Sequence, residues 1–332
     1  GRLVWLVGEI APLVGADRAL AERAARLCKA DLVTGMVGEF PELQGVMGRE
    51  YTRGSEDPEV SLAIYEHYLP RGATDVLPTR DAGAIVGIAD RLDTLVGIFG
   101  IGRKPTGAAD PFGLRRACIA ILNIVLGRNY RLSLSAAIDK SLDLLGTKVP
   151  QRDKTRTEVL EFIRGRLENL WGEQYRKDVV DAVLAAGFDD VVDARNRLEA
   201  MSAIVGLPDF EPLASTFKRV ANIVEKQGKG VAGRAVDAAV LQEDAERALF
   251  KAYEDARGKV EGAIRAGDYP AALREITQLK PSVDHFFDKV LVMAEDPKVK
   301  ENRLALLVSI GRLFGGIAQF ARIQAGEQAK AA

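Results

Sequence analysis

Apolar residues recur every three or four positions through most of this chain, which is the spacing of an amphipathic helix. The clearest case lies between residues 85 and 125, where two apolar stripes are separated by a glycine-rich turn. The first stripe is formed by Ile85, Ile88, Leu92, Val96 and Phe99. The second stripe covers residues 114–125. This region therefore predicts two core helices joined by an irregular loop.

The loop and the start of the second helix carry most of the exposed charge of this region. We expect Asp110 and Pro111 to restart the helix, because aspartate is a good N-cap and proline suits the first helical position. Four basic residues lie nearby: Arg103, Lys104, Arg115 and Arg116. They could neutralise phosphates of an RNA backbone. They could equally form polar contacts with another domain or subunit, and the pattern leaves both readings open.

Helical spacing also covers most of the remaining chain, and no strand pattern stands out, so the fold is predicted to be all α. The further helices are expected at residues 2–15, 18–28, 59–68, 131–146, 154–170, 177–186, 190–204, 213–224, 235–264, 270–279, 281–293 and 299–324. Residues 38–58 lack this period and predict a long ordered loop. The last residues, 327–332, are expected to fray.

Composition narrows the function classes. A length of 332 residues favours two domains. The net charge of −1 means that any RNA contact must rest on local basic patches. No apolar run approaches the ~20 residues of a membrane span, and no secretory signal opens the chain. Cys28 and Cys118 stand alone, so we expect both to be core thiols of a cytoplasmic protein.

Several long motifs closely resemble the β subunit of the bacterial heterotetrameric glycyl-tRNA synthetase. They are KADLVT (29–34), MVGEFPELQGVMG (36–48), ADRLDTLVGIFGIG (89–102), DPFGLRRA (110–117), FKRVANI (217–223) and FFDKVLVMA (286–294). They match the C-terminal half of a longer subunit, so the chain is expected to be a fragment. One departure is Ala108-Ala109 after KPTG, where the family has Ser-Lys. The lost basic residue weakens the case for a phosphate contact there.

The resemblance implies three parts: a degenerate HD-like helical domain over residues 1–150, a helical connector over 151–206, and an anticodon-binding-like helical domain over 207–332. It implies the tRNA-binding part of glycine–tRNA ligase, which positions tRNA(Gly) for a separate catalytic α subunit. ATP and Mg are expected on that α subunit, and this chain is expected to bind no cofactor and to be catalytically silent. The implied partners are tRNA(Gly) and the α subunit, with no DNA and no membrane.

Asp31, His67, Asp90 and Asp93 invite the alternative of an HD-type, metal-dependent phosphohydrolase. The sequence departs from the HD pattern, because Ala30-Asp31 stands where an HD domain has a His-Asp pair. The chain contains two histidines, whereas a transition metal in such a site needs several imidazoles. We therefore expect degenerate HD positions at Asp31, His67 and Asp90, no metal and no catalytic residues. Asp90 and Asp93 are expected to anchor arginine or backbone donors.

Basic residues also gather near the end of the predicted helix at 213–224. They are accompanied by one acid, Glu225, and they could simply stabilise the helix dipole. This region resembles the helical anticodon-binding domain also found in arginyl-tRNA synthetases. The resemblance makes four residues candidates for contacts with the anticodon stem-loop: Lys218, Arg219, Asn222 and Arg303. Phe286 is expected in the core and Phe287 to be the freer ring. A helical interaction scaffold without RNA binding remains a further alternative.

Overall fold

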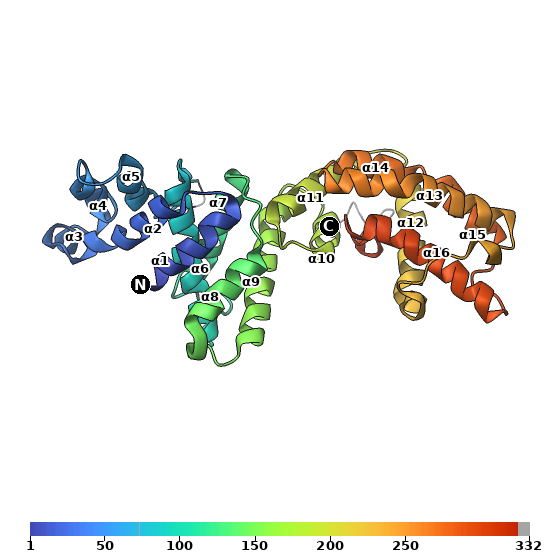
Figure 1. Cartoon of the computed structure of the whole chain (residues 1–332), viewed down its shortest axis with the longest axis horizontal. Helices are drawn as coiled ribbons and strands as arrows, with labels where there is room; N and C mark the ends of the chain where they lie inside the picture. The colour runs from blue at the N-terminus through green and yellow to red at the C-terminus, as the bar shows by residue number, and fades with distance from the viewer. Residues whose placement is uncertain (73, 325–332) are drawn as a thin grey trace. The chain divides into compact units, whose positions relative to one another are not determined.

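The computed structural model describes residues 1–72 and 74–324 (Figure 1). Over these residues the chain consists of α-helices and short 3-10 helices, and β structure is limited to isolated bridges such as Thr106–Ala109. The all-α prediction is therefore confirmed. The chain divides into two compact units, one made of residues 1–167 with 189–192, the other of residues 168–188 with those from 193 onward. Within the described ranges, no helix has the length and apolar content needed to cross a bilayer.

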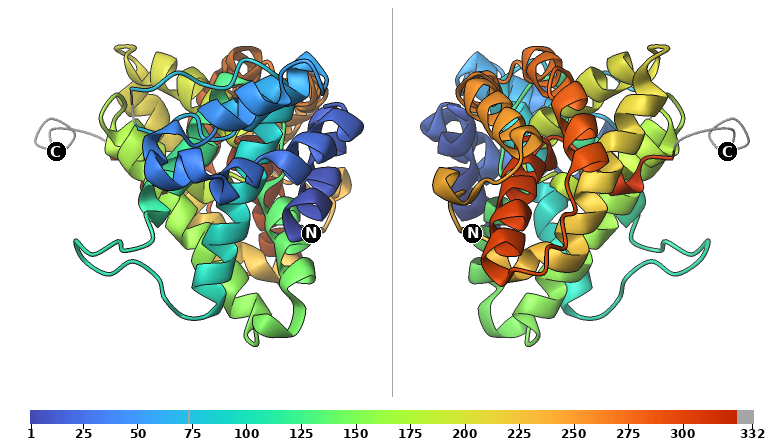
Figure 2. Two further views of the ribbon diagram at one scale, coloured as in Figure 1. Left: turned by 90° about the vertical axis from the view of Figure 1, so that its left-hand side faces the viewer. Right: turned by 90° about the vertical axis from the view of Figure 1, so that its right-hand side faces the viewer.

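The first unit is built around one long helix, α6 (Asp81–Gly100). Helices α1, α2, α5, α7 and α8 all pack against it. Their bounds are Arg2–Ile10, Arg18–Leu27, Pro58–Glu66, Leu114–Gly127 and Leu134–Leu145. Ile85, Ile88 and Val96 of α6 are fully buried, as the apolar stripe predicts. In Figure 2 the loop between α6 and α7 extends away from the helices of its own unit.

Helix α7 begins later than the sequence predicted. Asp110 does act as a cap, since its carboxylate accepts the backbone N–H groups of Leu114 at 2.8 Å and Arg115 at 2.9 Å. Gly113 adopts the left-handed region at φ 64°, which turns the chain into the helix only at Leu114. The predicted start at Pro111 is therefore wrong, although the capping residue was identified correctly.

The predicted loop at residues 38–58 contains helical turns, so that prediction is also corrected. After η2 (Ala30–Val33), the segment runs through the end of α3 (Gly35–Glu39), η3 (Pro41–Leu43) and α4 (Val46–Thr52). Asp31 explains α4, because its carboxylate accepts the N–H groups of Gly45 at 2.6 Å and Gly48 at 3.1 Å. A cap supplied by a residue 14 positions earlier leaves no trace in the local hydrophobic period.

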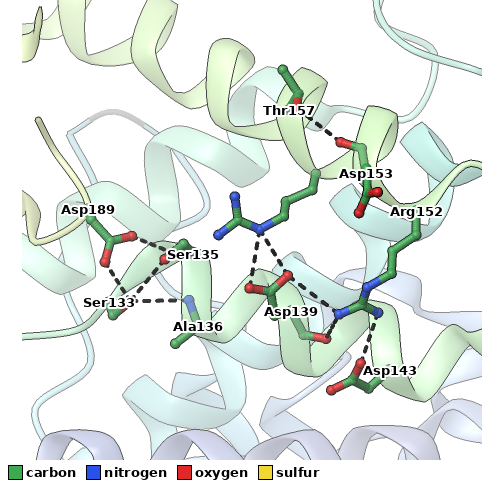
Figure 3. Close-up of polar contacts among 10 residues, drawn as sticks. Ser133, Ser135, Ala136, Asp139, Asp143, Arg152, Asp153, Thr157 and Asp189 are labelled. Atoms are coloured by element: carbon green, nitrogen blue, oxygen red, sulfur yellow. Dashed lines mark hydrogen bonds and ion pairs between the residues drawn. The ribbon is translucent and has the colours of Figure 1, made fainter.

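Helices α9 (Arg152–Gly172), α10 (Lys177–Ala186) and α11 (Val191–Val205) lie where three helices were predicted. Figure 3 shows how α8 and α9 are held together within the first unit. Asp139 accepts from Arg156 at 2.9 Å, and Arg152 pairs with Asp143 at 2.9 Å. Because α9 passes from one unit into the other, the proposed connector is divided between them. The three-part division into domains stays a prediction.

The second unit contains α12 (Phe210–Gln227), α13 (Asp244–Arg265), α14 (Tyr269–Thr277), α15 (Lys280–Lys289) and α16 (Pro297–Gly315). Helix α12 packs on α15 and α16, and α13 packs on α14, α15 and α16. Part of the core is an aromatic cluster in which the ring centroids of Phe217 and Phe314 lie 5.1 Å apart. Short 3-10 helices complete the two units: η1 (Ala11–Val14), η4 (Gly146–Lys148), η5 (Gly228–Val231), η6 (Ala238–Val240) and η7 (Phe320–Arg322).

Three predictions for this unit are corrected. The helix predicted from residue 235 begins at Asp244, after a capping box formed by Glu243 and Glu246. The last predicted helix, 299–324, ends at Gly315. The helix predicted at 281–293 ends at Lys289, so Met293 lies beyond α15 and is 42% exposed. The predicted fraying of residues 327–332 lies outside the described residues.

Candidate nucleic-acid interface

The side chains at the degenerate HD positions make contacts within the fold. His67 is buried at the end of α5, and its Nδ1 atom donates to the Ile64 carbonyl oxygen at 2.7 Å. Burial, reinforced by the nearby Lys29 ammonium, lowers the pKa of His67 to about 3, so the ring is neutral at physiological pH. Asp31 is also buried, and one of its carboxylate oxygens accepts hydrogen bonds from backbone N–H groups at the start of α4.

The two carboxylates of α6 each face a cation. Asp90 pairs with Lys29 at 2.9 Å, and Asp93 forms a bidentate pair with Arg2 at 2.8 Å. The expectation that they anchor donors is confirmed for Asp93 with an arginine, whereas the partner of Asp90 is a lysine. Within residues 1–72 and 74–324, no three or more His, Cys, Asp and Glu side chains lie close enough together to hold a metal ion.

The two cysteines and the second histidine lie where the sequence predicts. Cys28 and Cys118 are buried, as predicted, and burial raises the pKa of each thiol to about 12. A thiol with so high a pKa is a poor nucleophile at neutral pH. His285 is exposed on α15, as a surface helix histidine should be.

The four basic candidates near α7 separate into two pairs. Lys104 forms an ion pair with Glu158 at 2.8 Å, and Arg115 donates to the Ala108 carbonyl oxygen at 3.3 Å. Both contacts lie within the first unit, so neither tests the predicted contact with RNA or with another domain or subunit. Arg103 and Arg116 are exposed, and neither forms an ion pair within the described residues. These two cations are therefore available to an external anion.

Helix α12 presents an accessible cation next to an aromatic ring. The guanidinium of Arg219 lies 4.0 Å from the ring centroid of Phe287 on α15. Phe286 is fully buried while Phe287 is half-buried, so the predicted contrast between the two rings is confirmed. Lys218 is half-buried, and its ammonium donates to the Ile323 carbonyl oxygen at 3.3 Å. Of these two basic residues, Arg219 is the more accessible.

One turn further along α12, Asn222 and Glu225 line a pocket of about 530 Å³. Phe314 and Phe320 also line it, and both are buried. The polar groups of Asn222 and Glu225 make no hydrogen bond or ion pair within the part of the chain that the structure describes. An amide and a carboxylate beside aromatic side chains can together hydrogen-bond a base edge.

Comparison with known proteins agrees with this arrangement. A family model described as glycyl-tRNA synthetase beta subunit matches residues 1–185, which is more than half of the chain. The chain belongs to the glycyl-tRNA synthetase β subunit family. A second model, described as DALR anticodon binding domain, matches residues 213–325 of this family member. That range contains Arg219, Asn222 and Phe287.

Individual members of the family are also similar along almost the whole chain. The glycine–tRNA ligase β subunit of Myxococcus xanthus (strain DK1622) is 61% identical over 99% of this chain and 47% of its own length. The β subunit of Anaeromyxobacter dehalogenans (strain 2CP-C) is 52% identical over 99% of this chain and 48% of its own length. The chain spans about half the length of the curated relatives it matches.

Within this β-subunit chain, Arg303 does not lie where a tRNA contact requires. It is 6% exposed on α16, forms an ion pair with the buried Glu246 of α13, and donates to the Leu291 carbonyl oxygen at 2.8 Å. Its predicted contact with the anticodon stem-loop is therefore corrected: the side chain joins two helices. The signal was present in the sequence, because Arg303 lies three residues before Leu306 on the same buried stripe.

Sequence reasoning treated Glu225 only as a charge that offsets its basic neighbours. The structure places its carboxylate at the pocket beside Asn222. The helical spacing of three residues was a sufficient signal, since residues three apart lie on the same face of a helix.

Proposed function

We propose that this chain is the tRNA-binding part of a glycine–tRNA ligase β subunit, which positions tRNA(Gly) for aminoacylation by a separate α subunit. The observation that carries the proposal is the exposed face of α12. There Arg219, Asn222 and Glu225 remain accessible within the residues matched by the anticodon-binding model. Family membership over residues 1–185 supports the same reading.

The chemistry of this face suits a single-stranded loop of RNA. Proteins read such loops by stacking unpaired bases on aromatic or guanidinium planes and by hydrogen-bonding the base edges. Arg219 and Phe287 supply a guanidinium group and an aromatic ring on which a base can stack, and the pocket beside Asn222 supplies the polar groups. Lys218 is the secondary candidate, because its ammonium is half-buried and already donates to Ile323.

In this proposal the chain acts through position and not through chemistry of its own. The buried thiols and the neutral His67 provide no nucleophile or base, and catalysis with ATP and Mg belongs to the α subunit. Holding the acceptor end of a bound tRNA near a separate active site lowers the barrier by proximity and orientation. The expected partners are tRNA(Gly) and the α subunit, in a cytoplasmic heterotetramer.

A fluorescence anisotropy titration with labelled tRNA(Gly) and a non-cognate tRNA tests the proposal. We expect tRNA(Gly) to bind more tightly. Replacing the ring in Phe287→Leu, or the cation in Arg219→Gln, should weaken binding by roughly tenfold because a base loses its stacking partner. Arg265→Gln is the matched control, since Arg265 is an exposed arginine at the end of α13. Equal affinity for both tRNAs would refute specific recognition.

A further inference from the structure

A second concave site lies in the first unit, between α7 and the chain that follows α5. It is a pocket of about 270 Å³ lined by Pro70, Arg71, Gly72, Arg116, Ile119, Ala120 and Asn123. The lining therefore combines two guanidinium groups and one amide with a small apolar wall. None of the degenerate HD positions contributes to it.

Both arginine side chains of this pocket are exposed. Within the described ranges neither Arg71 nor Arg116 forms an ion pair, whereas the part-buried Arg91 of the same unit donates to the carbonyl oxygens of His67 and Tyr68. The two carboxylate oxygens of Asp75 accept the backbone N–H groups of Arg71 at 2.8 Å and Val76 at 2.9 Å. The backbone bond from Arg71, and to a smaller extent the charge of its guanidinium, lower the pKa of Asp75. The Arg71 guanidinium lies 5.6 Å from the Tyr65 ring centroid.

We propose that this pocket binds the phosphate group of a nucleotide. Guanidinium groups match the geometry of phosphate oxygens with paired N–H donors, and the Asn123 amide can add a further N–H donor. Ile119 and Ala120 give an apolar surface for the attached sugar or base. Sequence reasoning identified Arg116 as a cation near α7 but had no reason to pair it with Arg71, which lies in a turn-rich stretch 45 residues earlier.

Two sources could supply such a phosphate: a free mononucleotide or the backbone of a bound RNA. The structure assigns the site to a phosphate of bound tRNA in the assembled enzyme. This assignment to tRNA rests on the proposed function. The phosphate chemistry itself does not depend on that function. The two parts can therefore be tested separately.

The first arm measures mononucleotide binding by isothermal titration with 5′-AMP, inorganic phosphate and adenosine. We expect AMP and phosphate to bind and adenosine, which has no phosphate, to bind at least about tenfold more weakly. Arg71→Gln and Arg116→Gln should each weaken AMP binding by about tenfold. Asn123→Asp, which keeps the shape but adds a negative charge, should weaken it as well, while circular dichroism confirms the fold.

Arg26→Gln is the matched control, because Arg26 is exposed on α2 and does not line the pocket. This change should leave AMP affinity within about twofold of the unaltered chain, since it removes the same charge from elsewhere on the unit. The proposal that the pocket binds phosphate would be overturned if adenosine bound as tightly as AMP. It would also be overturned if Arg26→Gln lowered AMP affinity as much as Arg71→Gln does.

The second arm measures tRNA affinity across a range of salt concentrations. Losing one phosphate contact should lower the slope of log affinity against log salt by about 0.9 in the Arg116→Gln variant. If the variants weaken AMP binding but change neither tRNA affinity nor its salt dependence, the pocket is a phosphate site and its assignment to bound tRNA is overturned. If the unaltered chain does not distinguish tRNA(Gly) from other tRNAs, the proposed function fails. The AMP titrations then still decide whether the pocket binds phosphate.

Discussion

Two arginines of the second unit illustrate how surroundings decide the use of a side chain. Arg219 on α12 is exposed, and its guanidinium lies over the Phe287 ring, 4.0 Å from the ring centroid, where it remains accessible to a ligand. Arg303 on α16 is buried, and its charge is matched by Glu246. The family resemblance suggested the same RNA contact for both. The difference teaches that a basic residue on a binding domain is a candidate contact only when no internal carboxylate already holds it.

The largest effect is expected where the internal pair is broken. Arg303→Met should lower the free energy of unfolding by about 3–5 kcal/mol, because it leaves the buried Glu246 carboxylate without its partner. Urea denaturation followed by circular dichroism measures the loss. The comparison requires Arg219→Met to cost far less stability and to act on tRNA affinity instead. Exposed Arg312 of α16 supplies a second control, Arg312→Met.

A loss below about 1 kcal/mol for Arg303→Met would contradict the assignment of Arg303 as a structural residue. The double change Glu246→Met with Arg303→Met should recover part of the stability, since no charge is then left buried. Full recovery is not expected, because Glu246 also accepts the backbone N–H groups of Gln242 at 2.6 Å and Glu243 at 3.1 Å.

A similar comparison separates the two histidines, and its effect is intermediate. The folded-state pKa of His67 is about 3, whereas a histidine in an unfolded chain titrates near 6.5. As the pH falls through this window, the unfolded state binds a proton that the folded state does not. His67 should therefore lower the free energy of unfolding by about 1.4 kcal/mol for each pH unit below about 6.5.

Urea denaturation at several pH values from 7 to 4 tests this expectation. The His67→Gln variant should show a shallower fall in stability than the unaltered chain over that window. His285→Gln, at an exposed position of α15, should leave the pH dependence as it is. Identical pH dependence in all three proteins would mean that His67 is protonated equally in the folded and unfolded states.

The smallest effect concerns the loop between α6 and α7. Lys104→Gln removes the partly exposed pair with Glu158 and should cost less than about 1 kcal/mol. Hydrogen exchange is sensitive enough to detect it. The backbone amides of Thr106 and Ala109, which bond across the loop at 3.3 and 3.0 Å, should exchange about twofold to fivefold faster. Arg103→Gln, at an exposed position of the same loop, should leave these rates unchanged.

Much of the fold could be predicted because burial leaves a periodic trace. The stripe from Ile85 to Phe99 identified α6. The helix predicted at 18–28 corresponds to α2, whose first turn is capped by the Asp17 carboxylate, which accepts the Leu20 N–H at 3.0 Å. The sequence motifs identified the family because they are long and follow one another in the family's order along the chain. Such features depend on neighbours close in sequence.

What could not be predicted depends on residues far apart in sequence. Helix α4 is capped by Asp31, and the pocket on α7 needs Arg71 to meet Arg116. Neither meeting follows from local spacing. Arg303 is a different case, since its place on the apolar stripe of α16 was visible, but the resemblance to an anticodon-binding domain was given more weight than the stripe.

The Lys104–Glu158 contact also affects how a salt titration of this protein is interpreted. Added ions screen the protein's own bridge as well as those it makes with a polyanion. A loop freed at high ionic strength changes the surface that the polyanion meets, so the apparent number of displaced counterions includes an intramolecular contribution. Repeating the titration on a chain that already lacks the Lys104 ammonium removes that contribution and leaves the intermolecular count.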